Sequence, residues 1–527
     1  MHSRTRAAFL PLLFILTAAS PAELQQWKKQ ADRVTITRDD WGIAHVRGKT
    51  DADAVFGMIY AQAEDDFPRI EANYLTSLGR TAEADGEKAI WQDLRARLYV
   101  SEDGLKANYA ASPTWLKRLM DSWAASLNYY LATHPQTRPR VLTRFEPWMA
   151  LSFTEGSIGG DIERIDLGDL EKFYSGKRTI ASVEKNGDPT GSNGIAIAPA
   201  ITKDRHALLL INPHTSFFFR SEQQVTSGDG LNAYGAATWG QFFIYQGFNE
   251  HAGWMHTSSG VDVVDEFAEK IERKGKGYCY RYGKDCRPVA MRPVTVRYRK
   301  ADGTLGSREF DTYRTHHGPI VREADGRWVA FAMMDKPVTA LQQSFLRTKT
   351  ASLADFLKVA EFKSNSSNNT IFADDRGEIA YLHPQFVPTR NDRFDYEKPV
   401  DGSDPATDWG PLHPLNQLPS SLNPAVGWVQ NTNAWPYRAA GPNSVDPKRF
   451  PKYMDVFGEN WRGLHAQQLL GGSKGWTLDR LQAAAFDSYQ PGFADLIPPL
   501  IKAYDALPKK DPRRTRLEGP ISMLRGW

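Results

Sequence analysis

A serine stands between small residues in Gly191-Ser192-Asn193-Gly194, immediately before the apolar run at residues 195–198. Such a run predicts a buried strand, where a loop hydroxyl is unusual. If the chain were cut before Ser192, its hydroxyl would be a nucleophile and its freed α-amine a base. An α-amine has a reference pKa of about 7.7–8.0 and can accept a proton near neutral pH. We therefore predict a cleavage junction between Gly191 and Ser192; a turn serine that caps a strand is the simpler alternative.

The segment before this serine, residues 166–191, is polar and has little periodicity. It contains Lys185-Asn186-Gly187-Asp188-Pro189, a composition typical of exposed loops that proteases and processing reactions can reach. We therefore expect three products from residue 23 onward: a light chain over residues 23–165, an excised spacer over 166–191 and a heavy chain over 192–527.

The N-terminus resembles an export signal. Two arginines precede an apolar run at residues 7–16, and small residues follow. This order is typical of a secretory signal peptide, and the apolar run is too short to span a bilayer. We predict a signal peptide in residues 1–22, cleaved after Ala19 or Ala22, and a periplasmic or secreted protein without a stable membrane anchor.

Composition excludes some partners. The 527 residues are 41% apolar, and 65 Lys and Arg nearly balance 62 Asp and Glu. Such a balance argues against nucleic acid as a main partner. The two cysteines, Cys279 and Cys286, flank a turn in an aromatic-rich segment that predicts a hairpin. In an oxidising compartment we expect them to form a local disulfide rather than a zinc site.

Hydrophobic periodicity divides the chain into a helical first part and a sheet-rich second part. Helices are expected after Thr50 and after Ser112-Pro113, where apolar residues keep helical spacing. The expected later elements are strands at 195–198, 207–211, 217–219 and 242–245, a hairpin through 294–298 and 308–313, and helices at 352–360 and 478–485. This order predicts an α+β protein rather than alternating βαβ units.

Four motifs in order resemble one family. No Gly-x-Ser-x-Gly elbow with a spaced Asp and His is present, which disfavours an α/β-hydrolase. The Gly191/Ser192 junction resembles the autocleaved serine of the penicillin acylase (penicillin amidase) family of N-terminal nucleophile hydrolases. The other matching segments are Asp40-Trp41-Gly42-Ile43-Ala44-His45 with Ala61-Gln62-Ala63-Glu64-Asp65, Gly247-Phe248-Asn249 with Trp254-Met255-His256-Thr257-Ser258, and Gln430-Asn431-Thr432-Asn433. The resemblance implies a four-layer αββα fold, with a helical light chain wrapped on a sheet-rich heavy chain as a heterodimer.

The resemblance also implies catalytic roles. Ser192 would be the nucleophile, and its amine would accept the hydroxyl proton through a water molecule. The backbone N–H of Ser258 and the side-chain amide of Asn433 would stabilise the oxyanion, with Asn431 as the alternative by register. Arg462 would support the site beside the nucleophile. If the chain were instead an unrelated α+β protein, Ser192, Ser258 and Asn433 would not be expected to lie close together.

Two further roles rest on the same resemblance. His214 lies where aculeacin-type, acyl-homoserine-lactone and cephalosporin acylases carry a histidine and penicillin G acylase carries a glutamine. Its imidazole would tune the α-amine, although a histidine within a turn is the plain alternative. Asp262, Val264 and Asp265 resemble part of the family's structural calcium site, since two carboxylates and a carbonyl suit a hard cation. No cofactor is expected for catalysis.

The expected function is amide hydrolysis of small N-acylated molecules, closest in character to the acyl-homoserine-lactone and aculeacin acylase branch. Acyl-homoserine lactones come first, acylated lipopeptides second and β-lactam side chains third, because of His214. The family's heavy chain normally continues past Trp527, so the chain is C-terminally short. That shortness leaves a second hypothesis, a non-catalytic acyl-ligand-binding remnant of the family.

Overall fold

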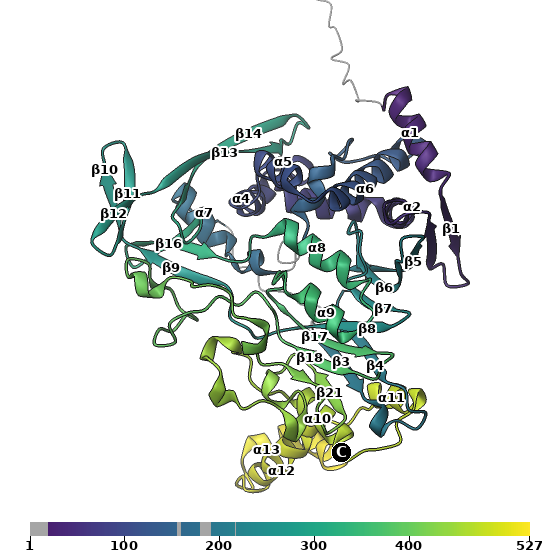
Figure 1. The fold of residues 1–527 in the computed structure, drawn as a ribbon. Helices are drawn as coiled ribbons and strands as arrows, with labels where there is room; N and C mark the ends of the chain where they lie inside the picture. Colours follow the sequence, from purple (N-terminus) through teal and green to yellow (C-terminus); the bar gives the residue numbers. More distant parts are fainter. Residues whose placement is uncertain (1–18, 155–159, 180–190, 217) are drawn as a thin grey trace, which may run out of the picture.

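The computed structural model describes residues 19–154, 160–179, 191–216 and 218–527 (Figure 1). Most of the expected signal peptide, residues 180–190 of the expected spacer and position 217 of an expected strand lie outside these residues. Within the described part, no helix has the length and apolar character needed to cross a membrane.

Two long helices organise the first part of the chain. Helices α2 (Asp51–Leu78) and α6 (Thr114–Thr133) pack against each other. Thr50 caps α2, because its hydroxyl accepts a hydrogen bond from the backbone N–H of Asp53. Trp123 lies on the apolar stripe of α6 and is fully buried, as the helical spacing predicts.

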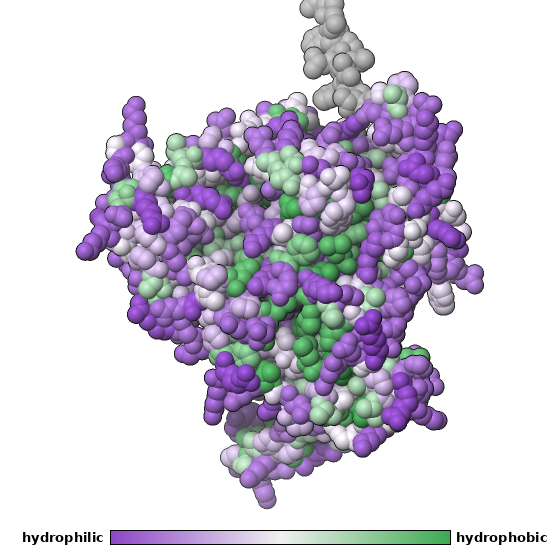
Figure 2. All heavy atoms as spheres, viewed as in Figure 1, coloured by the Kyte–Doolittle hydropathy of each residue, from purple (hydrophilic) through white to green (hydrophobic). Residues whose placement is uncertain are grey.

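The other helices are shorter and occur along the whole chain. They are α1 (Pro21–Ala31), α3 (Ala82–Asp85), α4 (Ile90–Arg97), α5 (Glu102–Ala111), α7 (Leu167–Ser175), α8 (Pro337–Arg347), α9 (Leu353–Ala360), α10 (Trp461–Leu470), α11 (Leu478–Ala485), α12 (Pro491–Asp505) and α13 (Pro512–Arg525). Apolar side chains gather around α8 and α9 on the face drawn in Figure 2, whereas hydrophilic ones cover the hairpins at its edge.

The largest sheet joins the two parts of the chain. Its order is β1 (Val34–Arg38), β2 (Ala44–Gly48), β5 (Arg220–Ser227), β6 (Asn232–Thr238), β7 (Gln246–Asn249), β8 (Ala252–Ser258), β17 (Asn368–Asp374), β18 (Ile379–Leu382) and β20 (Ser421–Leu422). Strands β2 and β5 pair in parallel, and the other neighbours are antiparallel. Residues 44–48 from the expected light chain therefore sit inside a sheet of the expected heavy chain.

A second sheet, in the order β21 (Trp428–Asn431), β3 (Gly191–Ile197) and β4 (Leu208–His214), carries the candidate nucleophile. Neighbouring residues in a strand face opposite sides of a sheet. Trp254 accordingly packs with α2 and α6, whereas Met255 packs with Ala196 of β3. The large sheet thus has helices on one face and the small sheet on the other.

The outer face of the small sheet is covered by helices near the end of the chain. Ile195 and Ile197 of β3 share a buried cluster with Leu470 of α10 and Leu481 of α11. These contacts fix α10 against the strand that carries residue 192. The chain is therefore a mixed helix and sheet protein, and its candidate nucleophile lies between packed layers.

The remaining strands form a distinct region at one end of the molecule (Figure 1). A four-stranded sheet has the order β15 (Ile320–Ala324), β16 (Arg327–Ala332), β9 (Asp265–Glu269) and β19 (Val400–Asp401), and β13 (Ala290–Arg299) pairs with β14 (Leu305–Arg314). Strands β10 (Ile271–Lys274), β11 (Gly277–Tyr282) and β12 (Asp285–Pro288) form a small sheet. In it a disulfide with an S–S distance of 2.03 Å joins Cys279 to Cys286.

Three segments differ from the sequence-based expectation. Residues 218 and 219, predicted to lie in a strand, form none, because β5 begins only at Arg220. Residues 242–245 form no strand, because Phe242 and Phe243 are buried in the helical core before β7 begins. The expected spacer contains helix α7, whose Leu170 is fully buried and whose Tyr174 hydroxyl donates to the carbonyl of Ile320 at 2.8 Å. Its buried face was hidden in the sequence among charged residues.

Candidate active site

Ser192 is the second residue of β3, the middle strand of the small sheet. It pairs with Pro213 of β4 and is only 6% exposed. The Ser192 hydroxyl donates a hydrogen bond to the carbonyl oxygen of Gly191 at 2.5 Å. The candidate nucleophile therefore lies beside the peptide carbonyl that an autocleavage reaction would attack.

Asn433 connects the nucleophile to β8. Its Oδ1 accepts hydrogen bonds from the backbone N–H of Ser192 at 2.6 Å and from Nη2 of Arg462 at 3.0 Å. Its Nδ2 donates to the carbonyl of Ser258 at 3.1 Å. The two donors on Oδ1 fix the amide orientation, since a flipped amide would place NH₂ against them. Ser192, Ser258 and Asn433 thus meet at one place.

Arg462 lies in the first turn of α10 and reaches across to β3. Its Nη1 donates to the carbonyl of Ser192 at 3.2 Å and to Oδ1 of Asn193 at 2.9 Å. Together with its contact to Asn433, this guanidinium holds the C-terminal side of the junction, at Ser192 and Asn193. Positive charge therefore stands within hydrogen-bond reach of the residues around the candidate nucleophile.

Asn460 positions both Arg462 and Asn433. It caps α10, because its Oδ1 accepts from the backbone N–H of Gly463 at 2.9 Å. Its Nδ2 donates to the carbonyls of Thr432 and Asn433, each at 3.1 Å. One side chain therefore ties the helix start to the loop that presents Asn433.

Asn431 has a supporting position rather than a direct contact with Ser192. Its Oδ1 accepts from the hydroxyl of Thr257 at 2.6 Å and from the backbone N–H of Asn433 at 2.9 Å. Its Nδ2 donates to the carbonyl of Ala434 at 2.8 Å. These bonds hold Asn433 in a left-handed backbone conformation, with φ of 62°.

His214 pairs with Gly191 across the β3–β4 ladder. Its Nε2 lies 3.0 Å from Oδ1 of Asn212 and 3.3 Å from Nδ2 of Asn193. Burial, and then the charge of Arg462, lower the pKa of His214. The imidazole is therefore a neutral hydrogen-bonding group at pH 7.

The glycine at the junction is needed for close approach. A Cβ at position 191 would stand 3.2 Å from Nη2 of Arg462, 3.2 Å from Oδ1 of Asn433 and 3.3 Å from Nδ1 of His214. Few side chains could enter that space without displacing the three polar groups. Gly191 therefore lets them converge on the peptide bond before Ser192.

Sequence reasoning did not assign roles to three asparagines of this site: Asn193, Asn212 and Asn460. Asn193 and Asn212 face each other across the ladder and share a hydrogen bond of 3.1 Å. The polar residue directly after the candidate nucleophile was the available signal for Asn193. Asn460 could have been found as a helix cap before Trp461.

A family model described as penicillin amidase matches residues 33–527. The chain belongs to the penicillin amidase family. It is 24% identical over 477 residues to the acyl-homoserine lactone acylase PvdQ of Pseudomonas syringae pv. syringae, covering 78% of this chain and 60% of the relative.

Other relatives of this penicillin amidase family member carry different names. The acyl-homoserine lactone acylase QuiP of Pseudomonas fluorescens is 25% identical, over 78% of this chain and 56% of the relative. Penicillin G acylase of Escherichia coli is 27% identical, over 63% and 38% respectively. The chain thus spans at most about three fifths of the length of these curated relatives.

A solved structure supports the fold. Penicillin G acylase from Alcaligenes faecalis aligns with a TM-score of 0.50 at 20% identity, covering 64% of this chain and 59% of the other. At that identity the likeness concerns the fold. It agrees with the mixed helix and sheet architecture of this family member.

The residues predicted to bind calcium surround an arginine. Nη1 of Arg390 donates to both carboxylate oxygens of Asp265, at 2.6 and 2.8 Å, and Nη2 donates to the carbonyl of Asp262. Ca²⁺ requires six to eight oxygen ligands, and a guanidinium occupies the space between these aspartates. In this arrangement Asp262, Val264 and Asp265 do not fit a calcium ion.

Proposed function

We propose that this protein is an autoprocessed acylase that hydrolyses the amide bond of N-acylated small molecules through an acyl-Ser192 intermediate. The observation that carries the proposal is the convergence of the Ser192 hydroxyl and backbone nitrogen with Asn433 and Arg462. The family membership supports the same chemistry. The proposal includes a light and a heavy chain held together in a four-layer αββα arrangement, and export directed by residues 1–22.

Maturation would begin at the peptide bond between Gly191 and Ser192. The Ser192 oxygen attacks the Gly191 carbonyl carbon, the C–N bond breaks, and the nitrogen takes up the hydroxyl proton. The resulting ester is hydrolysed by water, which leaves a carboxylate on Gly191 and a free amine and hydroxyl on Ser192. The 2.5 Å contact between the hydroxyl and the Gly191 carbonyl supports this step.

Turnover would use the same atoms on an external amide. The α-amine accepts the hydroxyl proton, directly or through a water molecule, while the oxygen attacks the substrate carbonyl. The C–N bond then breaks, the leaving amine takes the proton, and water hydrolyses the acyl-serine ester. The Ser258 backbone N–H and Asn433 Nδ2 would stabilise the oxyanion, once Nδ2 leaves the carbonyl of Ser258.

The names of relatives and the position of His214 support a proposed substrate class. Two of the relatives described above are named acyl-homoserine lactone acylases, so we place N-acyl homoserine lactones first. β-Lactam side chains come second, because another relative is named penicillin G acylase. A neutral His214 would accept or donate one hydrogen bond beside the amine without adding charge.

The direct test compares wild type with Ser192→Ala by intact-mass measurement and by amine release from a panel of acyl substrates. Wild type should yield two chains and release amine, whereas Ser192→Ala should stay uncut and inactive. Ser473→Ala is the matched control, because its hydroxyl also donates to a carbonyl, that of Leu469 at 2.8 Å, outside the site. Acyl-ligand binding by an uncut, inactive wild type would favour the non-catalytic alternative.

A further inference from the structure

Two adjacent histidines and an aspartate converge far along the chain from the residues around Ser192. His316 and His317 lie in the loop between β14 and β15, and Asp408 ends the short 3₁₀ turn Pro405–Thr407. Oδ1 of Asp408 lies 2.9 Å from Nε2 of His317 and 3.5 Å from Nε2 of His316. These three ligand atoms all lie within 4.8 Å of one another.

The ring of His317 is held in place on three sides. It stacks on Phe267 with ring centroids 3.8 Å apart and planes 4° apart, and His316 lies against it at 3.8 Å. Its Nδ1 lies 2.8 Å from Oε1 of Glu269, a fully buried carboxylate of β9. A carboxylate on Nδ1 is the usual outer partner of a metal-binding imidazole, because it leaves the Nε2 lone pair free.

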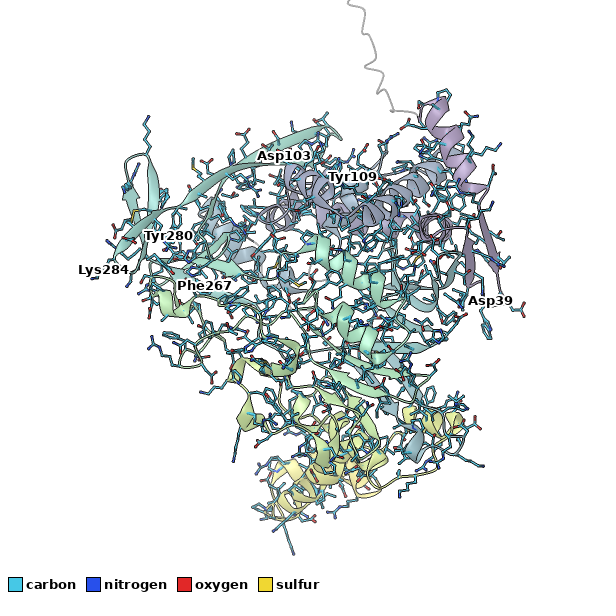
Figure 3. The ribbon with its side chains drawn as sticks, viewed as in Figure 1. Asp39, Asp103, Tyr109, Phe267, Tyr280 and Lys284 are labelled. Atoms are coloured by element: carbon cyan, nitrogen blue, oxygen red, sulfur yellow. A yellow bond between two sulfur atoms is a disulfide. The ribbon has the colours of Figure 1, made fainter. Side chains whose placement is uncertain are left out.

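The other two ligands are oriented by tyrosines of β11. The hydroxyl of Tyr280 lies 3.0 Å from Nδ1 of His316, and the hydroxyl of Tyr282 donates to Oδ2 of Asp408 at 2.5 Å. Figure 3 labels Tyr280 and Phe267, which both lie where the β10–β12 sheet meets β9. Other side chains therefore bind Nδ1 of each histidine and Oδ2 of Asp408. These contacts orient both Nε2 atoms and Oδ1 of Asp408 toward one shared point.

The separations suit a tetrahedral ion. Bonds of about 2.0–2.1 Å at tetrahedral angles place two ligand atoms about 3.3 Å apart. The separations of Asp408 Oδ1 from the two Nε2 atoms, 2.9 and 3.5 Å, lie on either side of this value. If Nδ1 of each ring carries the proton and donates it to its outer partner, two Nε2 lone pairs and a carboxylate oxygen face one another, and a cation between them would relieve that repulsion.

We propose that His316, His317 and Asp408 bind a Zn²⁺ ion, with Glu269 and Tyr280 as its outer partners. Water would complete the coordination, since the side chains of His316 and Asp408 are 32% and 28% exposed. The ion would tie the β14–β15 loop to the segment around residue 408. None of its ligands belongs to the acylase site, so binding does not depend on the proposed function.

A second cluster within the described residues is excluded as the zinc site. Glu272, Cys279 and Cys286 also lie close together, but the two sulfurs are joined in the disulfide. A disulfide sulfur is not the thiolate that Zn²⁺ requires. Experiments without reductant therefore report on the histidine site.

The test uses full-length, tag-free protein stripped of metal by a chelator and titrated calorimetrically with Zn²⁺. We expect one ion per chain. Co²⁺ in its place should give the strong visible absorption of a tetrahedral site. His316→Gln and Asp408→Asn should each weaken Zn²⁺ binding by at least roughly a hundredfold, and Tyr280→Phe by roughly tenfold, as loss of an outer partner does.

Matched variants separate this site from adventitious binding. His251→Gln removes an exposed histidine that is also paired with a carboxylate, Asp375 at 2.8 Å, and should leave Zn²⁺ affinity unchanged. The uncut Ser192→Ala protein should bind Zn²⁺ as wild type does. The assignment is overturned if no stoichiometric ion binds, or if folded His316→Gln and Asp408→Asn proteins keep the wild-type affinity.

Discussion

The backbone N–H of Ser192 donates a 2.6 Å hydrogen bond to Oδ1 of Asn433, a residue 241 positions later in the chain. Cleavage before Ser192 would turn this same nitrogen into an α-amine, already held by an acceptor. Nη1 of Arg462 donates to the carbonyl of the same serine at 3.2 Å, and a nearby positive charge favours the neutral amine. The hydrogen bond between the Ser192 nitrogen and Asn433 in the intact chain is therefore the one that would orient the α-amine in the proposed enzyme.

Replacing Asn433 separates its two roles. Asn433→Leu removes both the acceptor for the Ser192 nitrogen and the proposed oxyanion donor, so kcat should fall by roughly a hundred- to a thousandfold or more. Asn433→Asp keeps the acceptor and loses the donor. Its kcat should fall by a similar factor, and its KM should change less than that of Asn433→Leu. Steady-state kinetics on an acyl-homoserine lactone measures both.

The control for these variants is Asn443→Leu, which removes an amide that accepts from the backbone N–H of Val426 at 2.7 Å, away from the site. It should retain wild-type kinetics. Unchanged kcat in both Asn433 variants would remove Asn433 from the mechanism.

We expect His214 to affect how the activity depends on pH. Burial and Arg462 lower its pKa, so the imidazole is neutral at pH 7 and gains a proton only in acid. Wild type should lose activity with two protonations on the acid side, one on the amine and one on His214, and log kcat/KM should then fall with slope 2. His214→Gln should fall with slope 1. Equal slopes in pH–rate profiles would show that His214 does not act on the reaction.

Helix α7 predicts where the light chain ends. Leu170 is fully buried, so excision of residues 166–175 would expose a packed face. We therefore expect the mature light chain to extend past Ser175, and the excised segment to be shorter than 166–191. Mass spectrometry of the separated light chain measures its C-terminus directly. An end at residue 165 would contradict this expectation.

Arg390 predicts calcium-independent stability at the former calcium candidate. In protein stripped of metal by a chelator, the midpoint of thermal unfolding, Tm, should not change when CaCl₂ is added. Arg390→Met should cost about 3–5 kcal/mol, because it leaves the buried Asp265 carboxylate without its partner. Arg393→Met is the control, since its side chain is 62% exposed. A Tm that falls with EDTA and recovers with Ca²⁺ would restore the calcium prediction.

Because of Asp93, we expect the free energy of unfolding to decrease as pH rises toward 7. Its carboxylate accepts from the backbone N–H groups of Thr81 and Ala82, yet burial raises its pKa to about 7. A raised pKa means that the folded state holds the proton more tightly. Its contribution is therefore complete below about pH 4 and is lost as pH rises toward 7, by up to about 1.4 kcal/mol per pH unit.

Urea unfolding of Asp93→Asn at several pH values tests this. The variant should gain stability relative to wild type between pH 4 and 7, because it lacks the titrating proton. Asp103→Asn, at an exposed position of α5, should follow wild type. A constant difference between Asp93→Asn and wild type across this range would refute the assignment.

Helices whose ends are set by neighbouring residues could be predicted well from the sequence. Ser352 accepts from the backbone N–H of Asp355 and caps α9, and α11 spans Leu478–Ala485 as its spacing predicts. The strand predicted at residues 242–245 was wrong, since an apolar run has the same composition in a strand and in a buried loop. Tertiary packing against α2 and α6 decided between them.

The candidate site was predictable only in part. Ser192, Asn433 and Arg462 stand in motifs that resemble the family, and the structure brings them into contact. Asn460 and Arg390 were missed because their partners are set by folding: Arg390 meets Asp265 across 125 positions. No short motif encodes such a pairing, so it had to be observed.

The position of Ser192 within β3 has a mechanical consequence. Chain ends normally fray, because their residues have few partners and gain entropy by moving. Here the new end would be the start of a strand that is hydrogen-bonded on one side to β4 from residue 191 and on the other to β21 from residue 194. Cleavage would thus create a terminus with almost none of a terminus's freedom, and the entropy of aiming the amine would have been lost once, during folding, rather than at every turnover.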